Sequence, residues 1–255
     1  MTAALEVHGV RKSFGGVDAV TDVTFSVPAG TATALIGPNG AGKTTLFNLV
    51  TRLLPMTAGH ITYFGERLGP QPPEQIARMG LVRTFQTARV FPGMTVLENV
   101  LAGAHLHVRR SALSQMLWRR SARREEAHLR IRAEALLDLV GLQAVRDRPA
   151  TDLPMGGQKL LEVVRALMAG PRLLLLDEPA AGLNDTETAE LLALLRAIRT
   201  IGVTLLVVEH NMALVMGVAD QVVVLDAGRI VSAGTPAAIQ SDPAVIEAYV
   251  GRLDP

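Results

Sequence analysis

Two patterns of apolar residues follow one another along the chain and predict both strands and helices. Near the N-terminus, apolar and polar residues alternate over residues 5–10 and 20–27, as in strands with one buried face. Three short runs are almost wholly apolar, at residues 33–36, 173–176 and 203–208. Such runs are typical of strands buried on both faces of a parallel sheet. A helix-like stretch follows each run, so the pattern predicts an α/β protein.

The middle of the chain has a different pattern. We expect a strand over residues 60–65, a short helix over 73–79 and a strand over 81–85. From residue 95 to about residue 142 the periodicity is helical. The apolar residues expected to face the core are Val96, Leu97, Val100 and Leu101 in a first helix, and Leu129, Ile131, Ala135, Leu136, Leu139 and Val140 in a later one.

Composition narrows the classes of protein to consider. A chain of 255 residues can bury a substantial core. Its net charge of +1 gives no reason to expect nucleic acid or an acidic partner. The absence of cysteine excludes disulfides, thiol nucleophiles and cysteine-bound metals. No apolar run approaches the roughly 18 residues of a membrane span, and we find no signal-peptide pattern. We therefore expect a soluble, intracellular protein.

The clearest chemical motif is GPNGAGKTT, which lies between a predicted strand and a predicted helix. Glycines let successive backbone N–H groups turn toward an anion, and the positive end of the helix adds to their field. Lys43 can reach the β- and γ-phosphates, and the Thr44 hydroxyl can bind Mg²⁺. The alternative is a glycine-rich turn with an exposed lysine. The motif and its context instead predict a nucleoside triphosphate bound by Gly37, Pro38, Asn39, Gly40, Ala41, Gly42, Lys43, Thr44 and Thr45.

Acidic residues and a histidine end two of the buried strands. Asp177 and Glu178 follow four leucines, and Glu209-His210 follows residues 203–208. Right-handed crossovers bring both strand ends to the same edge of the sheet, where ligands of such sheets bind. Asp177 would hold Mg²⁺, Glu178 would polarise the attacking water, and His210 would contact the γ-phosphate. Otherwise the two acids merely cap the next helix, and the histidine is structural.

Two further features allow more than one interpretation. Phe14, beside two glycines, is either a loop anchor or a surface on which a nucleotide base stacks. A basic stretch either forms a solvated helix surface or contacts lipid headgroups or a membrane partner. Nucleic acid is less favoured there, because no aromatic residues are interleaved. The basic stretch comprises Arg109, Arg110, Arg119, Arg120, Arg123 and Arg124, with Trp118 among them.

Taken in order, these motifs resemble those of the ATP-binding subunits of ABC transporters over residues 4 to about 251. The phosphate loop, Gln86, Asp177-Glu178, the AAGLN segment and His210 all match. RTFQTARVFPGMTVLENV, DEPAAGLN, VVEHNM and AGTPAAI look most like the branched-chain amino acid uptake ATPases with the longer helical insertion. The resemblance implies a P-loop NTPase fold of the ABC ATPase type. It would be one domain over 1–255, with a mixed-sheet core and an N-terminal antiparallel β-subdomain in 1–86 and 156–255, and a helical subdomain in 87–155.

The resemblance also implies a mechanism and partners. Two subunits, identical or related, would sandwich two ATP molecules with Mg²⁺. Two transmembrane permease subunits would be driven from the inner face of the cell membrane, and a periplasmic or extracellular solute-binding protein would take part indirectly. Nucleic acid would not be a partner. Gln86, Glu178 and His210 would be catalytic; Thr44, Gln86 and Asp177 would bind Mg²⁺; Phe14 would stack on adenine.

Three other functions fit parts of the pattern. An ABC ATPase serving lipopolysaccharide export has a similar C-terminal ending. A non-transport ABC ATPase would usually have tandem cassettes or a long coiled-coil insertion, and this chain has neither. A P-loop kinase or GTPase would lack the ordered set of Gln86, Gly156 and His210.

One family motif departs from its usual form. The LSGGQ signature aligns with Leu153, Pro154, Met155, Gly156 and Gly157. Proline has neither a hydroxyl nor an N–H group, so the usual serine contact is lost at Pro154. Gly156 can still bring backbone N–H groups to a γ-phosphate. We therefore expect Pro154, Met155, Gly156 and Gly157 to contact the nucleotide of a partner subunit.

Overall fold

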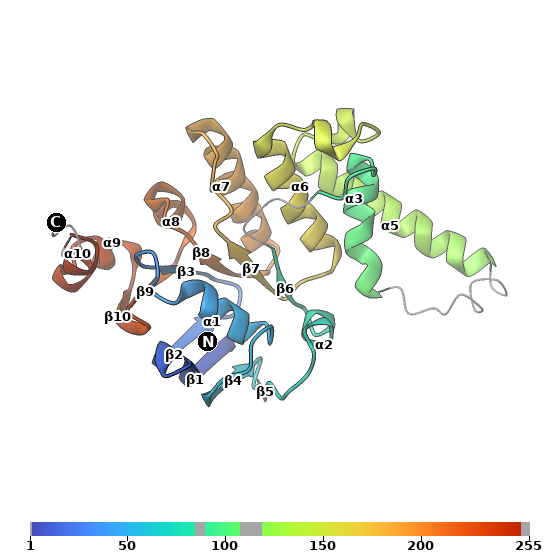
Figure 1. The fold of residues 1–255 in the computed structure, drawn as a ribbon. Coiled ribbons are helices and arrows are strands. Elements are labelled where there is room, and N and C mark those ends of the chain that lie inside the picture. Colours follow the sequence, from blue (N-terminus) through green and yellow to red (C-terminus); the bar gives the residue numbers. More distant parts are fainter. Residues whose placement is uncertain (1, 85–89, 108–118, 251–255) are drawn as a thin grey trace.

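An antiparallel sheet forms the N-terminal part of the protein (Figure 1). The computed structural model describes residues 2–84, 90–107 and 119–250. Burial alternates from Val23 to Val27 of β2, as the sequence pattern predicts, whereas register shifts interrupt the alternation in β1. In the order β2-β1-β4-β5, the strands are β2 (Val17–Pro28), β1 (Ala3–Phe14), β4 (Ala58–Tyr63) and β5 (Glu66–Arg67).

A second, mixed sheet forms the centre of the protein. Its order in the described part of the chain is β10-β9-β3-β8-β7-β6, and all neighbours are parallel except the β10–β9 pair. The three apolar runs form β3, β8 and β7, and every residue of these strands is buried. The strands are β3 (Ala32–Ile36), β6 (Leu81–Arg83), β7 (Leu173–Asp177), β8 (Thr204–Val208), β9 (Gln221–Asp226) and β10 (Arg229–Gly234).

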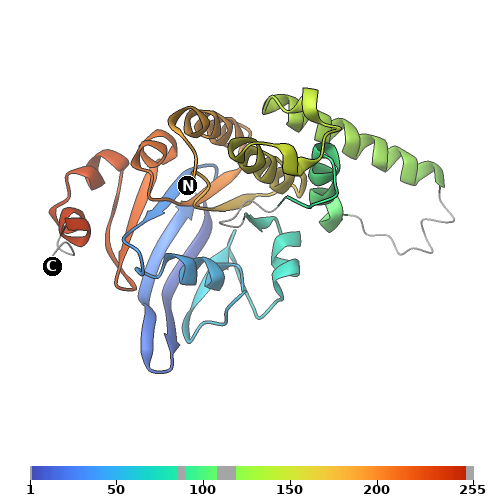
Figure 2. The same cartoon turned by 45° about the horizontal axis from the view of Figure 1, so that its top comes forward.

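Both faces of this sheet are covered, which explains why its strands are apolar throughout rather than alternating. On one face, Leu173, Leu175 and Leu206 pack with α1 (Lys43–Val50) and the antiparallel sheet. On the other, residues such as Leu174 and Leu205 pack with helices that Figure 2 shows along the opposite side. These helices are α3 (Val96–Ala102), α5 (Arg119–Leu139), α6 (Met155–Met168), α7 (Asp185–Thr200) and α8 (Met212–Val218).

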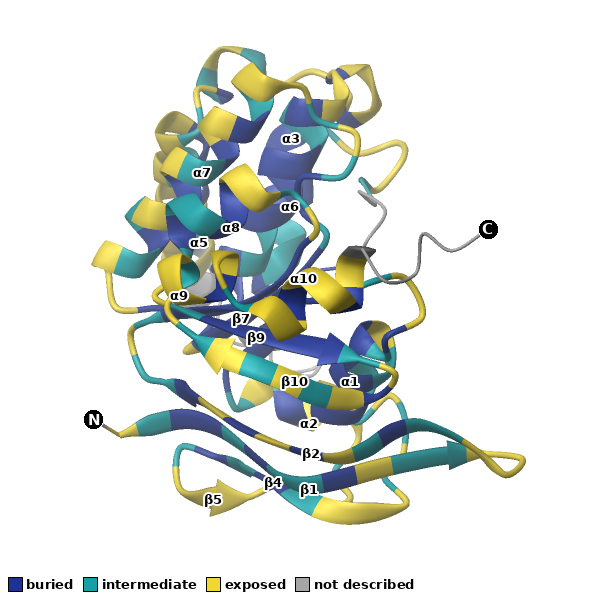
Figure 3. Ribbon diagram, turned by 90° about the vertical axis from the view of Figure 1, so that its left-hand side faces the viewer, coloured by how far each residue is buried: buried dark blue, intermediate teal, exposed yellow. Residues whose placement is uncertain are grey.

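The C-terminal elements pack against β3 and β9, near the β10 edge of the sheet. Ile239 and Val245 pack against Ala34 and Ile36 of β3, together with residues of β9 and α8. Figure 3 shows β10 and α10 with exposed outer sides. No helix of the described ranges is long and apolar enough to span a membrane. The remaining elements are α2 (Pro73–Arg78), η1 (Gly103–His107), η2 (Gln143–Val145), η3 (Ala150–Asp152), α9 (Pro236–Gln240) and α10 (Pro243–Val250).

The predicted apolar face of the later helix was partly wrong. In α5, Ala135 is exposed, and Ile131 and Leu139 are 64% and 55% exposed. The fully buried residues are Ala133 and Leu137. A residue two positions along a helix lies on nearly the opposite side, whereas a residue four positions along returns to the same side. The buried face therefore follows the four-residue step through Ala133 and Leu137.

Candidate functional site

The phosphate loop leaves the end of β3 and enters α1 by a path that demands glycine at two points. A Cβ atom on Gly37 would lie 2.0 Å from the carbonyl oxygen of Leu225, and one on Gly42 would lie 2.5 Å from that of Ala19. Gly42, with φ of 102°, caps α1 without any side-chain hydrogen bond, and the first turn carries no acidic residue. No carboxylate of the helix's own first turn therefore competes for its positive end.

The loop encloses a cavity of about 210 Å³. Two lining residues come from elsewhere in the fold: Ala19 from β2 and Glu178 from the end of β7. The cavity thus unites the predicted phosphate-binding residues with the predicted catalytic carboxylate. The loop residues that line it are Asn39, Gly40, Ala41, Gly42, Lys43, Thr44 and Thr45.

The Lys43 ammonium lies inside the loop. Its Nζ donates to the carbonyl oxygens of Gly37 at 2.7 Å and Pro38 at 2.9 Å. Burial lowers the pKa of Lys43 from its ordinary value, while Glu178 and Asp177 act in the opposite direction. Because these two hydrogen bonds already fix the Lys43 side chain beside the cavity, binding of an anion there would cost little further side-chain entropy.

Asp177, the last residue of β7, is buried beside α1 rather than among the residues that line the cavity. Its Oδ2 accepts a hydrogen bond from Nη2 of Arg83 at 2.7 Å. Nη1 of Arg83 donates to Oδ1 of Asn48 at 2.6 Å. Arg83 therefore joins the strand end that carries Asp177 to the helix that begins at Lys43. Sequence analysis missed this role, although an arginine within an apolar strand was visible.

Glu178 has a backbone conformation that is rare for a residue with a side chain. Its φ is 47°, and its N–H donates to the carbonyl oxygen of Val208 at 2.9 Å. Its own carbonyl oxygen accepts from Nζ of the buried Lys159 at 3.4 Å. A left-handed conformation costs on the order of 1 kcal/mol or more in a residue other than glycine. The surrounding structure therefore holds Glu178 at the rim of the cavity in a backbone conformation that is locally unfavourable in free energy.

His210 follows β8, the neighbour of β7, as the crossover argument predicted. The residue before it, Glu209, is fully buried. The Glu209 carboxylate accepts backbone N–H groups from Ala180 at 2.7 Å and from His210 and Asn211, both at 3.0 Å. The sequence pattern placed Glu209 at the end of an apolar strand, but we assigned it no role. An acid at the end of an apolar strand was the same signal that identified Glu178.

Phe14 lies at the end of β1 and pairs with Val17 across the hairpin that also supplies Ala19 to the cavity. Its side chain is 47% exposed, and Nζ of Lys12 lies 4.8 Å from the ring centre. An exposed ring can stack on a base, but Phe14 does not line the phosphate cavity. Adenine stacking by Phe14 stays a prediction.

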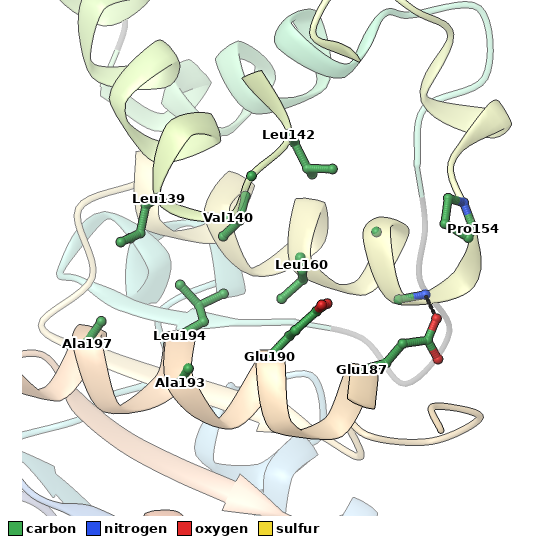
Figure 4. Close-up of a pocket in the computed structure, with 13 residues that line it drawn as sticks. Leu139, Val140, Leu142, Pro154, Leu160, Glu187, Glu190, Ala193, Leu194 and Ala197 are labelled. Atoms are coloured by element: carbon green, nitrogen blue, oxygen red, sulfur yellow. Dashed lines mark hydrogen bonds between the residues drawn. The ribbon is translucent and has the colours of Figure 1, made fainter. Parts of the chain in front are cut away.

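The signature segment lies in a different part of the protein from the phosphate loop. It borders a groove of about 710 Å³ between α6 and α7, whose lining shares no residue with the phosphate cavity (Figure 4). Pro154 is the N-cap of α6 and makes no side-chain cap. The N–H of Gly156 donates to Oε1 of Glu187 at 3.2 Å, and a Cβ atom on Gly156 would lie 2.6 Å from that oxygen. A side chain at position 156 would therefore displace the Glu187 carboxylate from the start of α6.

Several predicted residues fall outside the described ranges. Gln86 does so, and its predicted catalytic and Mg²⁺-binding roles stay predictions. The same is true of Arg109, Arg110 and Trp118. In the remainder of the basic stretch, Arg124 of α5 is exposed.

Comparisons with known proteins point to one family. A family model described as "ABC transporter" matches residues 20–181, and one described as "Branched-chain amino acid ATP-binding cassette transporter" matches residues 229–254. The high-affinity branched-chain amino acid transport ATP-binding protein LivG of Escherichia coli strain K12 is 42% identical over 249 residues, covering 97% of this chain and 98% of LivG. BraF of Pseudomonas aeruginosa, with the same description, is 43% identical over 249 residues and the same shares.

Solved structures agree as well. A nucleotide-free ATP-binding cassette from an ABC transporter superposes with a TM-score of 0.85 at 32% identity, covering 98% of this chain and 100% of that one. The ADP conformation of the cassette MJ1267 gives the same TM-score and coverage at 30% identity.

Proposed function

This chain belongs to the ABC transporter family of ATP-binding subunits, and from that premise we propose that it is the motor of an importer for branched-chain or related amino acids. The observation that carries the proposal is the cavity in which the phosphate loop and Glu178 meet. The C-terminal match to the branched-chain family and the full-length relatives support the class of solute. They do not favour a lipopolysaccharide exporter or a non-transport ATPase.

In the proposed reaction, each described group has a definite task. The phosphate-loop N–H groups and Lys43 hold the β- and γ-phosphates. Glu178, at the cavity rim, orients the attacking water and accepts its proton, while His210 contacts the γ-phosphate. Thr44, which lines the cavity, and Asp177, whose Oδ2 accepts from Arg83, carry oxygen donors of the kind that would suit Mg²⁺. Phosphates and waters would complete its shell, and Gln86 would add a third oxygen. When bound, Mg²⁺ neutralises charge on the phosphates.

A second subunit is needed to complete each site. The phosphate cavity and the groove beside the signature segment share no lining residue within one chain. Pro154, Met155, Gly156 and Gly157 would therefore act on the nucleotide of a partner, which is either a second copy or a related ATPase. Since Pro154 offers no hydroxyl, the contact would rely on backbone N–H groups near Gly156, and the Gly156 N–H would have to leave Oε1 of Glu187 to donate to the phosphate. Contact with two membrane permeases would hold the motor at the inner face of the membrane, with a solute-binding protein outside.

Dimerisation should therefore depend on ATP. We expect the Glu178→Gln variant to be largely monomeric without nucleotide and dimeric with Mg·ATP, because each γ-phosphate would be held by both subunits. Light scattering measures the mass in both conditions. The double variant Lys43→Ala/Glu178→Gln is the control and should stay monomeric. A monomeric mass for Glu178→Gln with Mg·ATP at high protein concentration would count against a sandwich formed by this chain with itself.

The transport function is tested in the assembled complex. We expect the chain, co-purified with its membrane subunits in proteoliposomes, to drive uptake of leucine, isoleucine or valine when its solute-binding protein and ATP are supplied. Uptake of radiolabelled amino acid is the measurement, and a complex containing Glu178→Gln is the control. ATP hydrolysis that none of the three amino acids stimulates would contradict the proposed solute class.

A further inference from the structure

The carboxylate of Glu209 is buried without a basic partner among the described side chains. Its accessible surface is 0%, and its oxygens are occupied by backbone N–H groups alone. Oε1 accepts from Ala180, and Oε2 accepts from both His210 and Asn211. Burying a charge is costly, and three directed N–H groups are the kind of arrangement that offsets the cost. An apolar residue would fill the same space without that cost but could not make these bonds.

The bond to Ala180 continues the connection between two segments beyond the last bond of the sheet, which runs from the N–H of Glu178 to the carbonyl oxygen of Val208. Ala180 lies two residues after Glu178, and His210 follows Glu209 directly. The Glu178 segment is closed by a turn, in which the N–H of Ala181 donates to the carbonyl oxygen of Glu178 at 3.1 Å. Glu209 therefore holds the loop after β7 and the loop after β8 in one fixed relation. Each of these loops carries one of the groups proposed to act on the γ-phosphate.

We propose that Glu209 is a positioning residue that sets His210 and the Glu178 loop against the same γ-phosphate. The inference rests on the proposed function, because it assumes that both groups act on ATP. Glu209 does not touch the nucleotide in this scheme. It acts through the backbone of His210 on one side and of Ala180 on the other. Its loss should therefore slow turnover and leave nucleotide binding by the phosphate loop intact.

Glu209→Gln tests the proposal directly. Glutamine has a similar shape but one acceptor oxygen, and its amide NH₂ would face N–H donors on one of the two sides. We expect kcat for ATP hydrolysis to fall about ten-fold or more, as for the loss of a hydrogen bond to a charged group that supports the transition state. The Kd for ATP should be unchanged. An unchanged kcat in a folded Glu209→Gln protein would overturn the proposal.

A double-mutant cycle separates positioning from general support of the fold. Because Glu209 acts partly through His210 and partly through the Glu178 loop, Glu209→Gln should cost less once His210→Ala is present, so the two losses should not fully multiply. Single-turnover measurement with labelled ATP resolves the slow rates involved. Losses that fully multiply would overturn the role of Glu209 and leave the proposed function standing. Full activity of His210→Ala would instead remove His210 from the proposed mechanism, and with it the reason for the positioning.

A matched control is available at the opposite end of the sheet. Oδ2 of Asp220 accepts the N–H of Ala32 at 2.9 Å, and Oδ1 accepts from Nη2 of Arg199 at 2.8 Å. Asp220→Asn removes a carboxylate that, like Glu209, accepts a backbone N–H group from another segment. It should lower the melting temperature without lowering kcat. If Glu209→Gln does not fold, Glu209→Asp enters the same cycle. Aspartate keeps the charge near His210 and Asn211 but is too short to keep the bond to Ala180, so the proposal again requires a lower kcat.

Discussion

Replacing Glu178 with glutamine is expected to lower kcat for ATP hydrolysis by about 100-fold or more, the usual loss when a positioned acid–base group is removed. Glutamine fits the same place at the cavity rim but cannot accept a proton from water. ATP binding should persist, because the phosphate loop and Lys43 are untouched. Steady-state phosphate release gives kcat, and titration with a fluorescent ATP analogue gives Kd.

The control for Glu178 is Glu66→Gln, which makes the same chemical change at an exposed position of β5. It should leave kcat and Kd as they are. Near-normal hydrolysis by Glu178→Gln would show that Glu178 is not the catalytic base. The base would then have to be another group at this edge of the sheet.

Replacing Lys43 with alanine is expected to weaken ATP binding by about 100-fold or more, since two or more hydrogen bonds from a charged group to the phosphates would be lost. The substitution also leaves the carbonyl oxygens of Gly37 and Pro38 without their present donor. The melting temperature without nucleotide therefore has to be measured beside the Kd. If the Kd for ATP rises while the melting temperature stays the same, the loss of affinity comes from the contact between Lys43 and the phosphates.

For Lys43, the surface substitution Arg78→Ala serves as the control, because it removes a cation from the exposed last turn of α2. It should not alter the Kd for ATP. Equal affinity of Lys43→Ala and the unmodified chain would mean that the backbone N–H groups of the loop bind the phosphates without the lysine.

Much of the fold could be predicted from local patterns. The strands around residues 33–36, 173–176 and 203–208 were identified because burial on both faces leaves an uninterrupted apolar run. The helical region was harder. Apolar residues outnumber buried positions in α5, so Ile131 and Leu139 appeared to be core residues although both are exposed. The predicted boundaries of a helical subdomain at 87–155 stay a prediction.

The phosphate cavity could be predicted because its main residues are contiguous, whereas the groups that support it are not. Arg83 meets Asp177 across 94 positions, and Gly156 meets Glu187 across 31. Such pairs depend on how separate strands and helices are placed, and a single sequence contains no signal for them. Glu209 shows the same limit, because its residue type was visible but its bond to Ala180 was not.

The left-handed backbone at Glu178 sets the activity of this protein against its stability. Glycine adopts a φ of 47° freely, so exchange of Glu178 for glycine would relieve the local cost while removing the carboxylate. A lineage selected only for the amount of folded protein would gain from that exchange. The acid at position 178 therefore serves the proposed reaction and not the fold, and a Glu178→Gly chain is expected to lose hydrolysis without losing folded protein.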